Sequence, residues 1–215
     1  MEPDRSDSDG RDAPSRVDRD VVINASMQLI PYVGATLAAL YFGHKQERRF
    51  RRLEEFYEEV RRELEAERTP LADPSAHDPD ALRALLEDLH EDVEREHLEV
   101  KRAYYRRYFK RTLADPVVGN YEERKLFLDT LGALSVLQLE VLAALARHGG
   151  TVRVSAISST TADLPLVRGG IQRLRTYGLV ETELNAVVFS SDKGSLDESV
   201  RITPFGRRFN DFCLR

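Results

Sequence analysis

Apolar residues in the second quarter of the chain follow the spacing of an amphipathic helix. Between Lys45 and Arg68 they recur at alternating steps of three and four, and charged residues fill the positions between them. The apolar positions of this seam are Phe50, Leu53, Tyr57, Val60 and Leu64. Such spacing places side chains along one stripe of a helix, as in coiled coils. Because the seam is shorter than a free-standing coiled coil needs, we expect it either to mediate self-association with a second copy or to pack against the next helix.

A second helical pattern runs from Pro79 to about Leu113. Its apolar face carries Leu82, Leu86, Leu89, Val93, Val100, Tyr104 and Tyr108. The preceding residues 69–79 hold three prolines, and Asp78 before Pro79 is typical of a helix N-terminus. The pattern therefore predicts an antiparallel hairpin of two long helices within a helical bundle that spans residues 44–132.

The end of the second predicted helix, Lys101 to Arg111, is both basic and aromatic. Interleaved cations and rings can contact nucleic acid or a membrane surface. Cations near a helix C-terminus also complement the helix dipole, while rings pack against a neighbouring element. Both interpretations stay open at this stage, and the second requires no ligand.

A domain boundary is predicted near residue 133. Residues 121–131 form a shorter helical pattern, and Gly132 stands where a glycine often closes a helix. Ser135 and Gln138 then have the spacing of a capping box at the start of another helix. We therefore expect residues 133–215 to form a separate domain.

Helical and strand patterns alternate in residues 133–215. The predicted order is helix 136–147, strand 151–154, short helix 155–160, helix 164–177, strand 179–189, loop 190–199, strand 200–203 and a last helix from Pro204. The whole chain is thus predicted to be mostly α, with a helical hairpin or bundle followed by a C-terminal α+β domain.

This order of elements resembles the winged-helix family. The segment GIQRLRTYGLVETE, which begins at Gly170, and the ending ITPFGRRF are similar to the recognition-helix exit and the closing strand of many bacterial transcription regulators. The resemblance implies a winged-helix domain of about 80 residues. In outline, a block LIPYVGATLAALYFG followed by RRFRRLEEFYEEV, a helical hairpin and this domain resembles a loose group of uncharacterised bacterial and phage-associated helical proteins. That second resemblance transfers no functional residues.

In a winged helix that binds DNA, the helix over residues 166–177 would enter the major groove. Side chains suited to base edges or phosphates on this helix and the predicted wing are Arg168, Gln172, Arg173, Arg175 and Lys193. Acidic side chains in the wing and Gly169–Gly170 in the helix weigh against tight phosphate contact. Residues 131–215 also carry only ten basic against eight acidic side chains. Contact with a protein partner is the alternative.

Residues 1–43 fall into two segments of different composition. Residues 1–20 hold seven acidic and four basic residues with few apolar ones, which predicts a disordered acidic tail. Residues 21–43 then pass without a formal charge, a length that would suit a membrane span. Polar residues and Pro31 interrupt the segment. They favour a buried helical hairpin or bundle segment, broken near Pro31, over a membrane span.

The chemistry-bearing residues indicate no active site. Net charge is −5, which argues against a protein that coats nucleic acid, and the single cysteine excludes an internal disulfide. Glu87, His90, Glu94 and His97 form two Glu-x-x-His units on one predicted helix. Metal sites of this kind draw their units from separate helices, so we predict neither a metal nor a cofactor. We expect a non-enzymatic protein.

Two functions from different classes follow. The first is a cytoplasmic regulator that forms a homo-oligomer through its helical region and binds double-stranded DNA through its winged helix. The second is a membrane-associated effector or adaptor, in which residues 21–43 contact the bilayer and the winged helix binds a protein partner.

Overall fold

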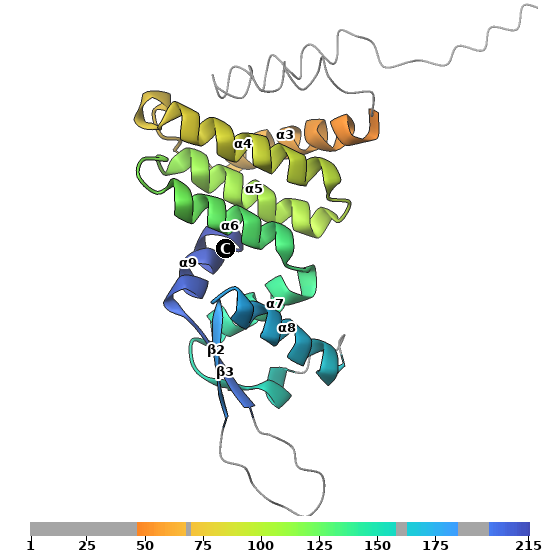
Figure 1. The fold of residues 1–215 in the computed structure, drawn as a ribbon. Coiled ribbons are helices and arrows are strands. Elements are labelled where there is room, and N and C mark those ends of the chain that lie inside the picture. The colour runs from red at the N-terminus through yellow and green to blue at the C-terminus, as the bar shows by residue number, and fades with distance from the viewer. Residues whose placement is uncertain (1–46, 68–69, 158–162, 185–197) are drawn as a thin grey trace, which may run out of the picture.

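The fold is mostly helical, with one small sheet near the C-terminus (Figure 1). A computed structural model describes residues 47–67, 70–157, 163–184 and 198–215. Its helices are α3 (Glu47–Glu67), α4 (Pro79–Arg95), α5 (Glu99–Ala114), α6 (Tyr121–Ala133), α7 (Val136–His148), α8 (Leu164–Thr176) and α9 (Pro204–Cys213). The strands are β1 (Val152–Arg153), β2 (Val180–Leu184) and β3 (Glu198–Ile202), antiparallel in the order β1-β3-β2. Helical and strand content therefore agree with the predicted class.

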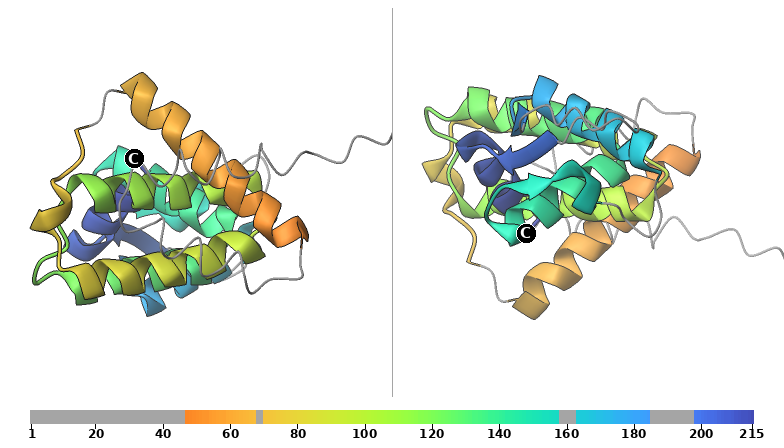
Figure 2. Two further views of the ribbon diagram at one scale, coloured as in Figure 1. Left: turned by 90° about the horizontal axis from the view of Figure 1, so that it is seen from above. Right: turned by 90° about the horizontal axis from the view of Figure 1, so that it is seen from below.

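Helices α3 to α6 form the N-terminal bundle. Tyr57 on α3 contacts His90 on α4, whereas Glu63 further along α3 pairs with Arg106 on α5. Together with Arg52 bonding to the Glu94 carbonyl, these contacts show that α3 runs antiparallel to α4. Seen from above, α3 lies across both α4 and α5 (Figure 2, left).

The predicted apolar seam of α3 packs inside this bundle. Leu53, Tyr57, Val60 and Leu64 are all buried in the single chain. Rings of α3 and α5 meet there, since Phe56 and Phe109 have centroids 5.8 Å apart. The side chain of Phe50, the first residue of the seam, lies outside the described part of the chain. Of the two alternatives, packing against the following helices thus accounts for the seam. Self-association through the seam stays a prediction, and it would require α3 to leave the bundle.

The prediction of one helix over residues 79–113 was wrong. Helix α4 ends at Arg95, and α5 starts at Glu99 and runs back along it. The connecting turn is closed by the Glu96 side chain, which accepts a hydrogen bond of 2.9 Å from the Leu98 backbone N–H. No glycine or proline marks this turn, so local sequence carries no stop signal. Exposure of Val100, at 52%, shows that the apolar face of α4 does not continue into α5.

The expectation that Gly132 closes a helix was also wrong. It lies within α6, which continues to Ala133, and its φ is not positive. The glycine is needed for close approach instead, because a Cβ there would lie 3.1 Å from Asp92 Oδ2 on α4 and 3.6 Å from the Tyr105 hydroxyl on α5. The capping box that follows is confirmed, with Ser135 N–H donating to Gln138 Oε1 at 2.9 Å.

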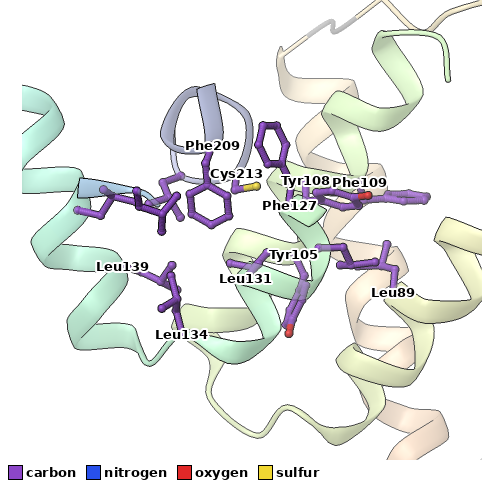
Figure 3. Packing of buried hydrophobic residues seen from close by; sticks show 14 of the residues in the cluster. Leu89, Tyr105, Tyr108, Phe109, Phe127, Leu131, Leu134, Leu139, Phe209 and Cys213 are labelled. Carbon is purple, nitrogen blue, oxygen red and sulfur yellow. The ribbon is translucent and has the colours of Figure 1, made fainter. Parts of the chain in front are cut away.

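The C-terminal region, α7 to α9 with the sheet, packs directly on the bundle. Phe209 on α9 lies against Phe127 on α6, with ring centroids 5.7 Å apart (Figure 3). The ring centroid of Phe212 lies 5.5 Å from that of Tyr108 on α5. Buried residues from Leu53 to Leu214 form one continuous cluster. The predicted boundary near residue 133 therefore separates two regions that share a core.

Glycine positions α9 against the sheet. The backbone of Gly206 comes so close to the start of β2 that an added Cβ would lie 2.1 Å from the Leu179 carbonyl oxygen. Thr203 caps the helix by accepting from the Gly206 N–H at 2.9 Å, and it also donates to the Gly178 carbonyl at 2.7 Å. These contacts hold the first turn of α9 beside the turn that follows α8.

Several predictions fall outside the described residues. They include the acidic tail 1–20, the uncharged segment 21–43, most of the loop 190–199 with Lys193, and the end of the short helix predicted at 155–160. The described part of that last segment is a single 3-10 turn, Val154–Ile157. Among the described helices, none is both long and apolar enough to cross a membrane.

Candidate nucleic-acid interface

Helix α8 is held in place by one apolar face. Val167, Ile171 and Leu174 are buried, at the i, i+4, i+7 spacing of a helix that packs on one side. Gly170 lies on the same face, where an added Cβ would sit 3.5 Å from Gln138 Cγ on α7. This distance is an ordinary van der Waals contact, so the face of α8 that carries Gly170 packs on α7 without requiring a glycine there.

The other side of α8 faces outward and carries the predicted contact residues. Arg168, Gln172, Arg173 and Arg175 are all exposed. At about 100° per residue, Arg168, Gln172 and Arg175 fall within roughly 60° of each other around the helix axis. Arg173 lies about 100° beyond Gln172, on the side away from Arg175. The structure therefore brings three of the predicted residues onto one face and sets Arg173 at its far edge.

The arginines of α8 contact neutral groups of their own chain. The guanidinium of Arg175 donates to the Thr182 hydroxyl on β2 at 3.1 Å. Arg173 donates to the Tyr177 hydroxyl at 3.2 Å, and its Cζ lies 5.2 Å from the centroid of that ring. Within the described residues, neither arginine forms an ion pair, and Arg168 has no hydrogen-bond partner. Their charges therefore remain available to a ligand.

Gly169 leaves a gap in this outward face. No heavy atom of the described residues lies within 4 Å of a Cβ built there, and its φ is not positive. Neither packing nor backbone geometry thus requires a glycine, which costs a helix about 1 kcal/mol relative to alanine. A bare backbone at this point allows a partner surface to approach the helix axis closely.

Charges on the neighbouring sheet are balanced. Arg201 on β3 pairs with Glu181 on β2 at 2.7 Å and lies 3.9 Å from Glu183. This cation is therefore neutralised by its own strand pair. The outward surface beside α8 is consequently less positive than a count of arginines implies. Lys193, the predicted wing contact, lies outside the described residues.

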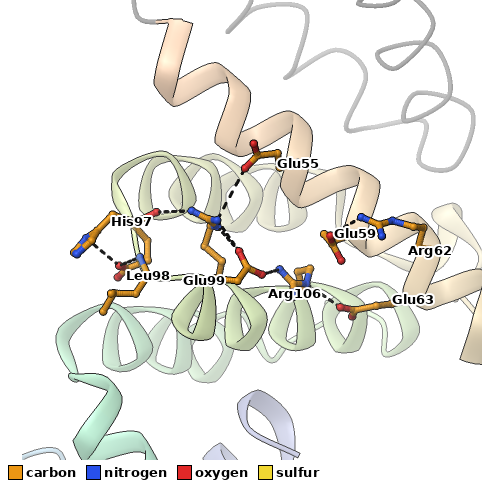
Figure 4. Close-up of polar contacts among 10 residues, drawn as sticks. Glu55, Glu59, Arg62, Glu63, His97, Leu98, Glu99 and Arg106 are labelled. Carbon is orange, nitrogen blue, oxygen red and sulfur yellow. Dashed lines mark hydrogen bonds and ion pairs between the residues drawn. The ribbon is translucent and has the colours of Figure 1, made fainter.

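The basic and aromatic segment of α5 is not a comparable surface, because four of its cations, Lys101, Arg102, Arg106 and Lys110, are paired with carboxylates of the bundle. Arg106 bridges Glu63 and Glu99, both at 2.8 Å (Figure 4). Lys110 contacts Glu67 at 2.7 Å. Partial burial raises the pKa of Glu63, but hydrogen bonds from Lys110 and Arg106 outweigh it and leave the pKa below its ordinary value. The segment is thus a structural contact between α5 and α3.

The Glu-x-x-His residues are also dispersed. Glu87 and His97 are exposed, whereas His90 is fully buried and bonds through Nε2 to the Tyr57 hydroxyl. Burial lowers the pKa of His90 to about 4 and raises that of Tyr57 above its ordinary value. In the part of the chain that the structure describes, no group of three or more His, Cys, Asp or Glu residues is arranged to hold a metal ion.

Sequence reasoning missed a second set of exposed arginines. Arg147 on α7 and Arg207 on α9 line one open groove, together with Arg215 just beyond α9. These residues stand far apart along the chain, and no motif connects them. One local signal was present in the sequence, the basic residues in the last turn of α7. Their favourable interaction with the helix dipole explains these residues equally well without a ligand.

Comparison with known proteins finds no matching family, no matching curated protein and no matching solved structure.

Proposed function

We propose that residues 133–215 form a winged-helix domain that binds double-stranded DNA through the outward face of α8. The observation that carries the proposal is the arginine-rich face of this helix, in which Arg168 and Arg175 flank Gln172 and no described carboxylate neutralises them. Guanidinium and amide side chains are the groups that read guanine and adenine in the major groove.

The arrangement of elements supports this proposal. Helix α7 is followed by β1, a short 3-10 turn, α8, β2 and β3, and the last two strands pair antiparallel with Val180 opposite Ile202. In the winged-helix arrangement, the helix before the strand hairpin is the one that enters the groove. Here that helix is α8, whose buried face rests on α7.

The proposed binding mode uses α8 as a rigid reader. Arg168 and Gln172 contact base edges, and Arg175, near β2, contacts a phosphate or a base beside them. The bare backbone at Gly169 lets the helix sit deep in the groove. Because few cations take part, we expect modest affinity and a shallow slope of log K against log salt, of roughly −1 for each phosphate that an arginine contacts.

Fluorescence anisotropy of the full chain with a labelled pool of random duplexes tests this function. The double variant Arg168→Ala/Arg175→Ala should bind at least about tenfold more weakly than the parent chain, because each arginine supplies an interaction of about 1 kcal/mol or more. The matched control is Arg61→Ala/Arg83→Ala, which also removes two exposed arginines but from the bundle, and we expect it to bind as the parent does.

Two results would contradict the proposal. One is absence of binding by the parent chain at low salt, where electrostatic attraction is strongest. The other is an equal loss of affinity in the α8 variant and in the bundle control, because such a loss would reflect overall charge rather than a specific face. A homo-oligomer stays a prediction, and sedimentation of the free and bound chain measures the number of copies per duplex.

A further inference from the structure

Two open pockets that share Arg215, together called the groove, gather basic side chains from α5, α7 and α9. Its larger part has a volume of about 570 Å³ and is lined by Arg147 of α7 and by Arg207, Asp211 and Arg215 at the end of the chain described here. A smaller adjoining part, of about 230 Å³, shares Arg215 and adds residues of α3 and α5. These added residues are Glu67, Arg107, Lys110, Arg111 and Ala114.

Two of the groove arginines are held in position by backbone carbonyl groups. Arg107 donates to the Leu214 carbonyl at 2.8 Å, and Arg207 donates to the Gly149 carbonyl at 3.2 Å. A guanidinium has five N–H donors, so each keeps several for a ligand. Because these side chains are already ordered, binding would cost less conformational entropy.

The remaining groove arginines are free of acidic partners within the described residues. Arg111, Arg147 and Arg215 are exposed and form no ion pair there. Of the two acidic residues that line the groove, Glu67 is bound by Lys110 at 2.7 Å. The groove is therefore strongly positive, although the whole chain has a net charge of −5.

An aromatic ring adjoins these cations. The Cζ of Arg107 lies 5.5 Å from the ring centroid of Tyr104 on α5, and Arg147 interacts electrostatically with the same tyrosine from α7. Tyr104 itself is not among the residues that line either pocket, so a planar base in the groove would stack on a guanidinium plane.

The groove and α8 face different directions. Seen from below, α8 lies along one edge of the molecule, and the C-terminus beside α7 lies towards the opposite edge (Figure 2, right). A straight duplex seated on α8 would not reach the groove. The groove arginines therefore require an explanation of their own.

We propose that this groove binds an organic phosphate of nucleotide size that carries two or more phosphate groups. One guanidinium group can donate two parallel hydrogen bonds to two oxygens of a phosphate. Several arginines around one cavity can therefore neutralise several phosphates. The volume lies in the range of small-molecule sites, about 300–1,000 Å³. The larger part is lined by α7 and α9 and the smaller part by α3 and α5, so a ligand that extends past Arg215 contacts both the C-terminal region and the bundle.

Isothermal titration of the full chain with two probes, sodium tripolyphosphate and ATP, tests the site. At about 150 mM NaCl, where exposed charges are screened beyond roughly 8 Å, both probes should bind with one site per chain. The variant Arg147→Ala/Arg215→Ala should bind both at least about tenfold more weakly, because both side chains line the groove. The matched control, Arg83→Ala/Arg95→Ala on α4, should bind as the parent does.

Comparison of the two probes identifies what is recognised. Tighter binding of ATP than of tripolyphosphate indicates that the base stacks in the groove, and equal binding indicates recognition of the phosphate chain alone. Absence of binding by the parent chain overturns the proposal, as does equal weakening in the groove variant and the α4 control.

A duplex-binding measurement separates this site from the proposed DNA surface. The groove variant should bind the labelled duplex pool as the parent does, even where it has lost tripolyphosphate. If it loses duplex affinity as the α8 variant does, the groove belongs to the DNA surface and the separate ligand site is refuted. Failure of α8 to bind DNA would leave the tripolyphosphate result unaffected.

Discussion

The bundle and the C-terminal region use the same residue, arginine, in opposite ways. In the bundle, Arg106 is buried and is held by carboxylates of α3 and α5 at 2.8 Å. In the C-terminal region, Arg168 and Arg175 are exposed and have no ionic partner in the described chain. A count of charges along the sequence does not distinguish the two cases, although their roles differ.

The difference shows where the molecule can still bind something. A paired and buried cation must lose its partner before it can bind a ligand. Breaking such a pair costs several kcal/mol. An exposed arginine gives up only water and rotamer freedom. Binding is therefore expected on α8 and in the groove beside α9, while the paired cations of α5, such as Arg106, stabilise the bundle.

The largest effect is expected where the two regions share one core. Phe209→Ala should lower the free energy of unfolding by about 3–4 kcal/mol, because a fully buried ring that packs on Phe127 is replaced by a cavity. Urea unfolding followed by circular dichroism measures the loss, and hydrogen exchange should accelerate in α4 and α7 together. Acceleration confined to α7 would mean that the regions unfold independently. Leu126→Ala, at an exposed position on α6, is the control.

The second-largest expected effect is a pH dependence of the free energy of unfolding, caused by the buried His90 of the bundle. Unfolded chains take up a proton on His90 below about pH 6.5, whereas burial in the fold delays protonation until about pH 4. The stability that His90 contributes as a neutral ring is therefore complete above pH 6.5 and falls as the pH drops towards 4. Between pH 6.5 and pH 5 the loss should be about 2 kcal/mol.

Urea unfolding at a series of pH values measures this loss. His90→Gln should flatten the pH dependence over this interval, since glutamine does not titrate. His97→Gln, at an exposed position, should leave the dependence as in the parent chain. An equal slope in the parent and in His90→Gln would refute the assignment.

A smaller effect distinguishes paired from exposed arginines in the bundle. Arg106→Ala should cost about 1–2 kcal/mol of stability, because Glu63 and Glu99 lose a hydrogen-bonded cation at the α3–α5 contact. Arg61→Ala removes an exposed pair with Glu65 and should cost less than about 0.5 kcal/mol. Thermal unfolding of both variants measures the difference, and similar losses would remove the contrast drawn above.

The smallest effect on stability is expected on α8. Arg168→Ala/Arg175→Ala should change the free energy of unfolding by less than about 0.5 kcal/mol, because within the described residues it removes one exposed hydrogen bond, from Arg175 to the Thr182 hydroxyl. The same variant is expected to lose DNA affinity, so function and stability separate at this site. A decrease in stability above about 1 kcal/mol in thermal unfolding would assign these arginines a structural role.

Local signals in the sequence determined those features that depend on neighbours along the chain. The capping box at Ser135, the helix start at Asp78 and the end of α7 at Gly149 all follow from hydrogen bonds within one turn. The outward position of Arg168, Gln172 and Arg175 follows from helical periodicity around a buried apolar face. Mostly helical content with a small C-terminal sheet was predictable for the same reason.

Only the tertiary structure decided which residues distant in sequence meet. The turn after Arg95 contains no glycine or proline that would end a helix. Contacts of α5 with α3 and α4 stabilise it, among them the ion pair of Arg106 with Glu63. Gly132 is needed because Asp92 and Tyr105 approach it from other helices, which no local rule reveals. Pairing of arginines depends on the same long-range contacts, so the sequence alone could not show that Arg106 of α5 is neutralised while Arg168 and Arg175 of α8 have no ionic partner in the described chain.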